Sequence, residues 1–139
     1  MTEVFTAETV IDRPVDAVWA RLVDWDGAAR WMPGVERLRA HGPTAVGTTL
    51  VFTARGKDRT ARIAAVEPGR SVTLRSSQGG VTADYVYTCA RHGEATRVSL
   101  VADCRMTGPI RLLGPVIRSA IRRADSGQLD AFAASFRSG

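Results

Sequence analysis

The sequence contains very little lysine, cysteine or histidine. Only Lys57 among its 19 basic residues is a lysine, and the 139 residues include two cysteines and two histidines. His41 precedes an expected turn and His92 lies within one, and the sequence shows no metal-ligand spacing, no phosphate-binding glycine loop and no nucleophile elbow. We therefore expect no metal and no other cofactor, and the sequence identifies no catalytic residue.

Long apolar runs are also missing. No stretch approaches the about 18 residues that a membrane-spanning helix needs, and the first four residues resemble neither a basic leader nor an apolar signal sequence. We expect a cytoplasmic protein without a transmembrane segment. The composition, 45% hydrophobic and 24% charged, is typical of a globular protein, and residues 1–139 suffice for a single domain with its own core.

The formal net charge of +5 raises the question of nucleic-acid binding. Most of the arginines are scattered among acidic or apolar residues, and no stacking platform of aromatic residues accompanies them. One denser group lies along the last expected helix: Arg111, Arg118, Arg122 and Arg123. We therefore expect no nucleic-acid partner.

The two cysteines are expected to be separate buried thiols. Cys89 and Cys104 lie near opposite ends of one expected hairpin, and pairing Ala90 with Ala95 puts the cysteines about 25 Å apart along the strands. A disulfide does not span such a distance. This arrangement is consistent with a reducing compartment.

The N-terminal quarter predicts a strand and two short helices. Alternating apolar residues indicate a strand from Glu3 to Asp12, and Pro14 suits the first position of the helix that follows. Residues 24–32 predict a second short helix or turn, which Pro33-Gly34 ends.

Beyond residue 34 the apolar period changes from helical to two, which predicts six strands of an antiparallel meander. The turns are expected at residues 42–43, 55–58, 67–70, 78–80 and 91–94. The predicted cross-strand pairs are Phe52–Ala61, Leu50–Ile63, Ile63–Leu74 and Ala65–Val72. In the last hairpin, the faces that carry Tyr85 and Tyr87 on one strand and Leu100 and Cys104 on the other are expected to coincide.

A long helix is predicted from Gly108 to Phe136, with a kink or break near Gly114-Pro115 because proline removes a helical hydrogen bond. Its expected inward stripe is Ile110, Leu113, Ile117, Ala120, Ile121, Ala124, Gln128 and Ala131. A second apolar stripe comprises Leu129, Phe132 and Phe136. This second stripe either packs inside a monomer or, if exposed, contacts a second subunit or an anionic membrane surface; between these two partners, we favour a homodimer.

Several short motifs resemble one known family. They are Ile11-Asp12-Arg13-Pro14, Val18-Trp19, Trp31-Met32-Pro33-Gly34-Val35 and Val66-Glu67-Pro68-Gly69-Arg70. Together with the order of elements, they resemble the START-like superfamily of polyketide cyclases, dehydrases and lipid-transfer proteins, also known as SRPBCC or Bet v 1-like. The resemblance implies an α+β helix-grip fold, in which a curved antiparallel sheet of about seven strands wraps around a long C-terminal helix. Two short helices would lie between strands 1 and 2, and a cavity between sheet and helix would hold a hydrophobic ligand.

The residues themselves also favour a cavity, because the C-terminal half of the last helix turns small side chains toward the sheet. Close packing of helix on sheet is the alternative. Tyr85 and Tyr87 could orient a ligand, while Gln128 would contact either the ligand or a tyrosine hydroxyl. The predicted ligand-binding residues are Trp31, Phe52, Tyr85, Tyr87, Met106, Ile117 and Gln128.

Three functions fit this sequence. The favoured one is the binding or carrying of an apolar small molecule such as a lipid, a polyketide or an isoprenoid-like compound. The second is a polyketide cyclase or dehydrase that shapes a reactive chain and polarises its carbonyls, and an ionisable group inside the cavity would favour it. The third is a structural or partner-interaction subunit with a filled core.

Overall fold

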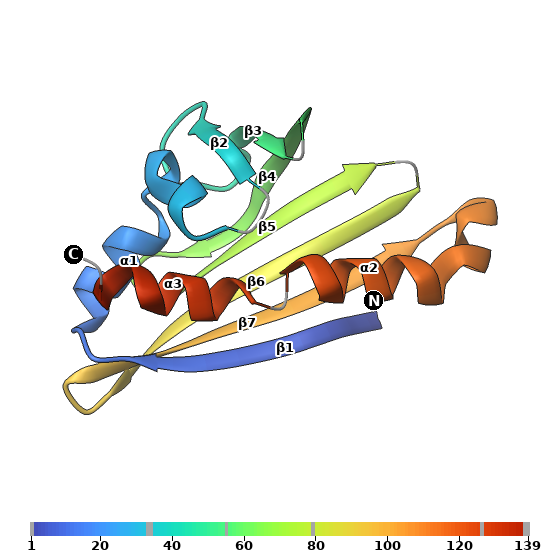
Figure 1. Ribbon diagram of the computed structural model, residues 1–139. Helices are drawn as coiled ribbons and strands as arrows, with labels where there is room; N and C mark the ends of the chain where they lie inside the picture. Colours follow the sequence, from blue (N-terminus) through green and yellow to red (C-terminus); the bar gives the residue numbers. More distant parts are fainter. Residues whose placement is uncertain (1, 33–34, 55, 79, 126, 138–139) are drawn as a thin grey trace.

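A computed structural model describes residues 2–32, 35–54, 56–78, 80–125 and 127–137. Within these residues, seven strands form one curved antiparallel sheet in the order β1-β7-β6-β5-β4-β3-β2 (Figure 1). The strands are β1 (Thr2–Ile11), β2 (Val35–Ala40), β3 (Thr49–Ala54), β4 (Lys57–Glu67), β5 (Ser71–Gln78), β6 (Val81–His92) and β7 (Ala95–Met106). The helices are α1 (Val15–Leu22), the 3₁₀ helix η1 (Trp25–Arg30), the 3₁₀ helix η2 (Gly108–Leu113), α2 (Gly114–Asp125) and α3 (Gln128–Arg137).

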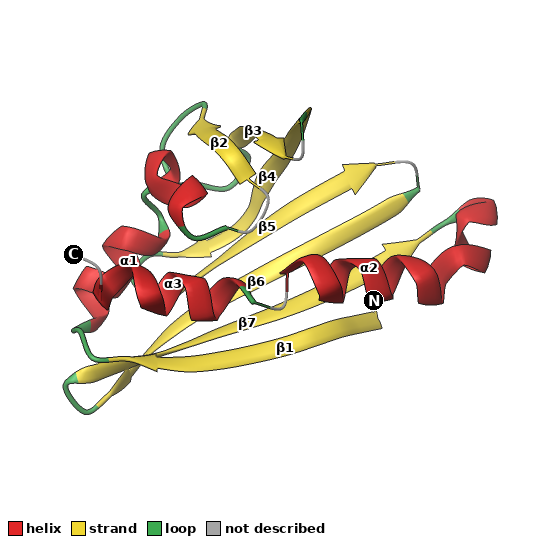
Figure 2. Ribbon diagram, in the orientation of Figure 1, coloured by secondary structure: helices red, strands yellow, loops and turns green. Residues whose placement is uncertain are grey.

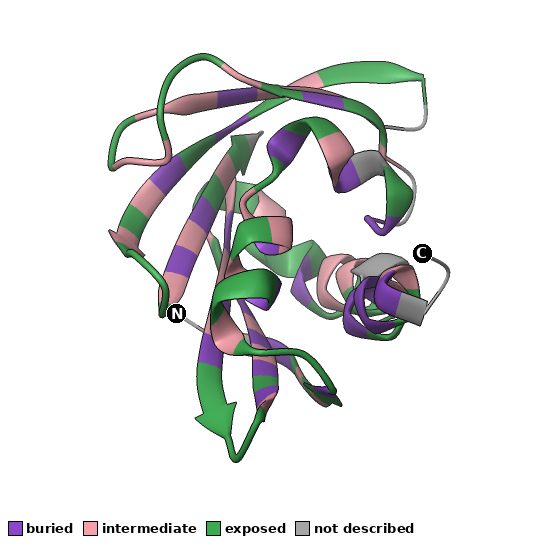
Figure 3. Cartoon of the chain, turned by 90° about the vertical axis from the view of Figure 1, so that its left-hand side faces the viewer, coloured by how far each residue is buried: buried purple, intermediate pink, exposed green. Residues whose placement is uncertain are grey.

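The helices lie on one side of the sheet, and α2 and α3 follow each other across it (Figure 2). This is the architecture expected from the sequence. Pro14 precedes α1 in an extended conformation instead of opening the helix, so the helix begins one residue later than predicted. Buried residues alternate with exposed ones along the strands (Figure 3), because successive side chains point to opposite faces.

Two of the hairpins are tighter than the sequence analysis predicts. Phe52 pairs with Arg59, not Ala61, since Gly56 with a φ of 79° lets Lys57 pair directly with Ala54. Leu50 accordingly pairs with Ala61 and not with Ile63.

The β6–β7 hairpin shows the same shift. His92 pairs with Ala95, whereas the predicted pair was Ala90–Ala95, and Gly93 has a φ of 66° in the turn. A shift of two residues preserves the face on which each side chain lies. The predicted sharing of one face by Tyr85, Tyr87 and the apolar residues of β7 is therefore confirmed.

An irregularity between Ile63 and Ala65 changes the β4–β5 register. The predicted pair Ile63–Leu74 is confirmed, but Val72 pairs with Val66 instead of Ala65. One extra residue in a strand produces this kind of offset and bends the strand locally.

The C-terminal region is not one long helix. The predicted break near Gly114 is confirmed, because η2 ends at Leu113 and α2 begins at Gly114. A second break, which the sequence analysis missed, separates the end of α2 at Asp125 from the start of α3 at Gln128. Gly127 lies in this second break, and glycine has the lowest helix propensity after proline.

The second apolar stripe belongs to the core. Leu129, Phe132 and Phe136 are 2%, 0% and 8% exposed, so of the two alternatives that the sequence left open the structure shows packing inside the monomer. The Phe132 ring lies 4.8 Å from the Trp31 ring and 5.4 Å from the Phe136 ring, measured between centroids. Packing of this stripe inside the monomer removes the observation that favoured a homodimer.

The predicted inward stripe is only partly inward. Gln128 in α3 is buried, but Leu113 is 52% exposed and Ala120 in α2 is also exposed. Ile117 and Ile121 are half-buried. The breaks at Gly114 and after Asp125 explain the difference, because η2, α2 and α3 turn independent faces toward the sheet.

Replacing Phe132 by alanine should destabilise the fold by about 3–5 kcal/mol, because it leaves a large cavity at a fully buried position. The free energy of unfolding in urea measures this loss. Leu112→Ala is the matched control, since Leu112 is 87% exposed and its truncation should change stability by less than about 0.5 kcal/mol. Equal effects of the two substitutions would contradict the placement of α3 in the core.

Candidate functional site

Three of the predicted binding residues meet in the interior. The Tyr87 hydroxyl on β6 donates a hydrogen bond of 2.6 Å to Oε1 of Gln128, the first residue of α3. The Trp31 ring, just after η1, meets the Tyr87 ring edge-on with centroids 6.1 Å apart. We refer to Trp31, Tyr87 and Gln128 as the inner cluster. All three residues are at least nine-tenths buried.

The inner cluster contains one unsatisfied donor. The indole Nε1 of Trp31 is buried and has no hydrogen-bond partner among the described residues. Trp25 shows the usual situation, because its Nε1 donates to the Thr44 hydroxyl at 3.1 Å. Native proteins satisfy most buried donors, so the Trp31 N–H is an exception that calls for an explanation.

Gln128 illustrates how a buried polar group is normally accommodated. The sequence analysis left two roles open for it, a ligand contact or a partner for a tyrosine, and the structure shows the second. This bond also joins α3 to the middle of the sheet. The inner cluster is therefore held in place from three separate elements.

The other four predicted residues are more dispersed. Tyr85 lies on the same face of β6 as Tyr87 and is half-buried between Leu74 and Ala102 on the neighbouring strands. Met106 at the end of β7 and Ile117 in α2 are also half-buried. That these residues and the inner cluster line one cavity stays a prediction.

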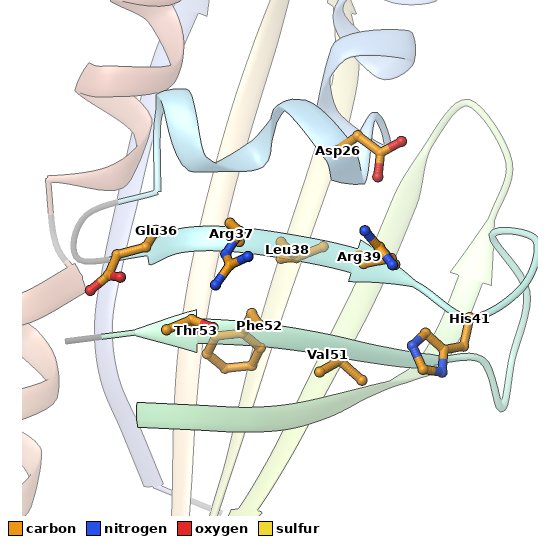
Figure 4. Close-up of a pocket in the computed structure, with 9 residues that line it drawn as sticks. All are labelled: Asp26, Glu36, Arg37, Leu38, Arg39, His41, Val51, Phe52 and Thr53. Carbon is orange, nitrogen blue, oxygen red and sulfur yellow. The ribbon is translucent and has the colours of Figure 1, made fainter. Parts of the chain in front are cut away.

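Phe52 lines a hollow of about 450 Å³ at the β2–β3 edge of the sheet (Figure 4). Its lining also includes Asp26, Glu36, Arg37, Leu38, Arg39, His41, Val51 and Thr53. This hollow was not predicted from the sequence, in which His41 was expected only to precede a turn. The alternation of Arg37 and Arg39 along β2, continued by His41 directly after the strand, was the available signal.

Arg118 of α2 supplies an ionisable group near the inner face of the sheet. Its Nε is buried without a hydrogen-bond partner in the described part of the chain, and its guanidinium group covers Gly114. The positive charge is close enough to Cys104 on β7 to act against the rise in that thiol's pKa. Arg122, one turn further along, instead donates a 3.0 Å bond to the backbone oxygen of Val4.

The carboxylate of Asp84 and the thiols of Cys89 and Cys104 have structural roles. Asp84, on the opposite face from Tyr85, accepts two hydrogen bonds from Arg75 at 2.8 and 2.9 Å, which together with the charge of Asp84 raise the pKa of Arg75. Cys89 and Cys104 are free and buried, as predicted. Burial raises the pKa of Cys89 to about 11, and that of Cys104 is also raised, so neither thiol is activated as a nucleophile.

A curved seven-stranded sheet that holds a C-terminal helix against its inner face defines the helix-grip class of proteins. A family model described as "Polyketide cyclase / dehydrase and lipid transport" matches residues 2–137. The chain belongs to this family. No helix in the described residues is long and apolar enough to cross a membrane.

Solved structures with the same fold include proteins of different kinds. The Zhui aromatase/cyclase from Streptomyces sp. R1128 is 16% identical with a TM-score of 0.75, covering 94% of this chain and 91% of its own. TTHA0849 from Thermus thermophilus is 20% identical with a TM-score of 0.72, covering 93% of each chain. Norcoclaurine synthase from Thalictrum flavum is 17% identical with a TM-score of 0.66, covering 96% of this chain and 86% of its own. No curated protein matches the sequence.

The raised pKa of Cys89 predicts a loss of stability in alkali. The folded state favours the protonated thiol, so this contribution is present below the ordinary pKa of 9.0 and is lost as the pH rises toward 11. The loss should reach about 1.4 kcal/mol per pH unit within that window. Urea unfolding at about pH 8 and about pH 10 measures it, with Cys89→Ala as the control that should lose less. Equal losses in both proteins would contradict the prediction.

Proposed function

We propose that this protein binds an apolar small molecule between the inner face of the sheet and helices α2 and α3, with a hydrogen-bond acceptor of the ligand facing Trp31. The buried Nε1 of Trp31, which has no hydrogen-bond partner within the described part of the chain, carries this proposal. A buried donor without a partner costs about 1–3 kcal/mol, and a ligand carbonyl, ether or hydroxyl oxygen would remove that cost.

The surroundings of Trp31 favour a ligand that is otherwise apolar. Its ring packs against Phe132 and Tyr87, and the Tyr87 hydroxyl already donates to Gln128. An aromatic or polyketide-like molecule with one well-placed oxygen would satisfy the indole N–H while leaving the existing hydrogen bond in place. The family description, which includes both cyclases and lipid transport, is consistent with such a ligand.

Trp31→Phe should remove the preference for a ligand that carries an acceptor. Acetylnaphthalene and ethylnaphthalene substituted at the same ring position have similar shapes, but only the first has a carbonyl oxygen. The wild-type protein should bind acetylnaphthalene about 2–12-fold more tightly, which corresponds to one neutral hydrogen bond. Binding is measured by titration calorimetry. The variant should bind the two compounds equally.

Trp25→Phe is the control for this experiment, because Nε1 of Trp25 already donates to Thr44. It should leave the preference between the two compounds unchanged. If neither compound nor any apolar analogue binds the wild-type protein, the proposed function is wrong. If both bind but Trp31→Phe keeps the preference, then Trp31 is not the donor.

A second candidate function is cyclisation of a poly-β-keto chain, and Arg118 is the observation that favours it. Nε of Arg118 is buried without an acceptor among the described residues, and the residue lies near Cys104 on the inner face of the sheet. A fixed cation in such a place can stabilise the negative charge that develops on a carbonyl oxygen during aldol ring closure. Holding the chain in a folded conformation would supply a further part of the rate.

Arg118→Gln separates this candidate from simple binding. If the protein is a cyclase, it should accelerate ring closure of a poly-β-keto thioester, and the variant should lose about 10²–10³-fold in rate. Product formation is followed by mass spectrometry and ultraviolet absorbance. Arg105→Gln, at an exposed arginine in β7, is the matched control. A wild-type protein that binds the thioester but leaves the spontaneous rate unchanged would exclude the cyclase.

A further inference from the structure

Large apolar side chains are exposed at the corner between η2 and α2. Leu112, Leu113 and Val116 are 87%, 52% and 67% exposed, and they account for three of the five large exposed apolar residues in the described part of the chain. All six residues of η2 are described, and none of them is buried. The core therefore does not need these side chains, and a surface function has to be considered for them.

The segment of the chain that contains this corner carries the excess charge of the protein. Residues 104–124 contain five arginines and no acidic residue, so the other 14 basic residues are matched by all 14 acidic ones. The net charge of +5 is thus concentrated in about a seventh of the sequence. Arg105 and Arg111 from this segment are exposed.

At this corner, exposed apolar side chains and a positively charged side chain lie close together. Nε of Arg111 donates to the backbone oxygen of Gly108 at 3.3 Å, which keeps this arginine on η2 beside Leu112. The corner projects beyond the ends of β5 and β6 (Figure 1, orange). The surface is therefore a protruding edge that combines exposed leucine and valine side chains with positive charge.

We propose that the η2–α2 corner docks on an anionic lipid surface. Leu112, Leu113 and Val116 would enter the boundary between headgroups and acyl chains, and the neighbouring arginines would contact anionic headgroups. A protruding apolar edge flanked by cations suits a deformable lipid surface. A stable protein partner would require a broad complementary face with well-packed anchors.

Vesicle co-sedimentation tests this proposal with two lipid compositions. The protein should bind vesicles of phosphatidylcholine mixed with phosphatidylglycerol and should bind pure phosphatidylcholine much less. Binding should weaken as salt is raised, because exposed charges are screened over about 8 Å at physiological ionic strength. This measurement requires no bound small molecule, so its outcome is independent of the function proposed for the interior.

Two variants address the two parts of the surface. Leu112→Ser combined with Val116→Ser should reduce the partition coefficient by at least about tenfold, because two apolar side chains no longer enter the lipid. Arg111→Gln should reduce it about fivefold, as expected for one charge near an anionic surface. Both substitutions fall at exposed positions, and circular dichroism and thermal unfolding would verify that the fold is retained.

The chain offers matched controls for both variants. Val46→Ser changes a 65% exposed apolar side chain elsewhere, and Arg91→Gln removes an exposed charge near the β6–β7 turn. Neither should affect vesicle binding. The proposal is overturned if anionic vesicles do not bind, or if the corner variants bind as well as the controls. It is also overturned if sedimentation shows a dimer that Leu112→Ser and Val116→Ser abolish, since the corner would then be a protein interface.

Discussion

The contact between Phe132 and Trp31 holds the architecture of the protein together. It joins α3, at the end of the chain, to the segment that follows η1, with ring centroids 4.8 Å apart. Phe136 extends this contact toward α1, because the guanidinium of Arg21 lies 4.2 Å above its ring. Arg21 also donates a 2.6 Å bond to the backbone oxygen of Ser135. The fixed position of α3 brings Gln128 to Tyr87 and leaves the Trp31 N–H facing the interior.

The two parts of the C-terminal helical region have different roles as a result. The large apolar residues of α3, namely Leu129, Phe132 and Phe136, are almost fully buried, whereas η2 and the start of α2 expose large apolar side chains. The break after Asp125 permits this difference. In a continuous helix, the same face would be turned toward the sheet along both parts. One part of the region thus fixes the inner cluster, and the other presents a basic apolar corner to the surroundings.

The feature that was predicted best from the sequence is the face of the sheet on which each strand side chain lies. The shared face of Tyr85, Tyr87 and the apolar residues of β7 depends only on alternation along each strand, and errors of two residues in the hairpin registers did not disturb it. Gln128 was recognisable because it is a polar residue in an apolar helical stripe. The registers themselves were missed because they depend on whether a glycine closes a turn of two residues or of four.

Other features depend on three-dimensional relations that a periodic pattern does not contain. Leu113 is exposed although its spacing placed it inward, because it belongs to η2, which ends where α2 begins at Gly114, and a single helical phase does not extend across that break. That Nε of Arg118 has no hydrogen-bond partner among the described residues depends on how this side chain folds back over Gly114. The hollow at the β2–β3 edge depends on the position of Asp26 in η1 relative to β2, which no local pattern specifies.

Whether the Trp31 N–H binds a ligand acceptor can be seen in the indole N–H signals of the three tryptophans in a proton–nitrogen NMR spectrum. On titration with acetylnaphthalene, the Trp31 signal should move downfield as its N–H gains an acceptor. The Trp25 signal should stay in place, because that N–H is already bonded to Thr44. Ethylnaphthalene should produce a smaller change at Trp31. A Trp31 signal that does not move when acetylnaphthalene is bound at saturation would contradict the account.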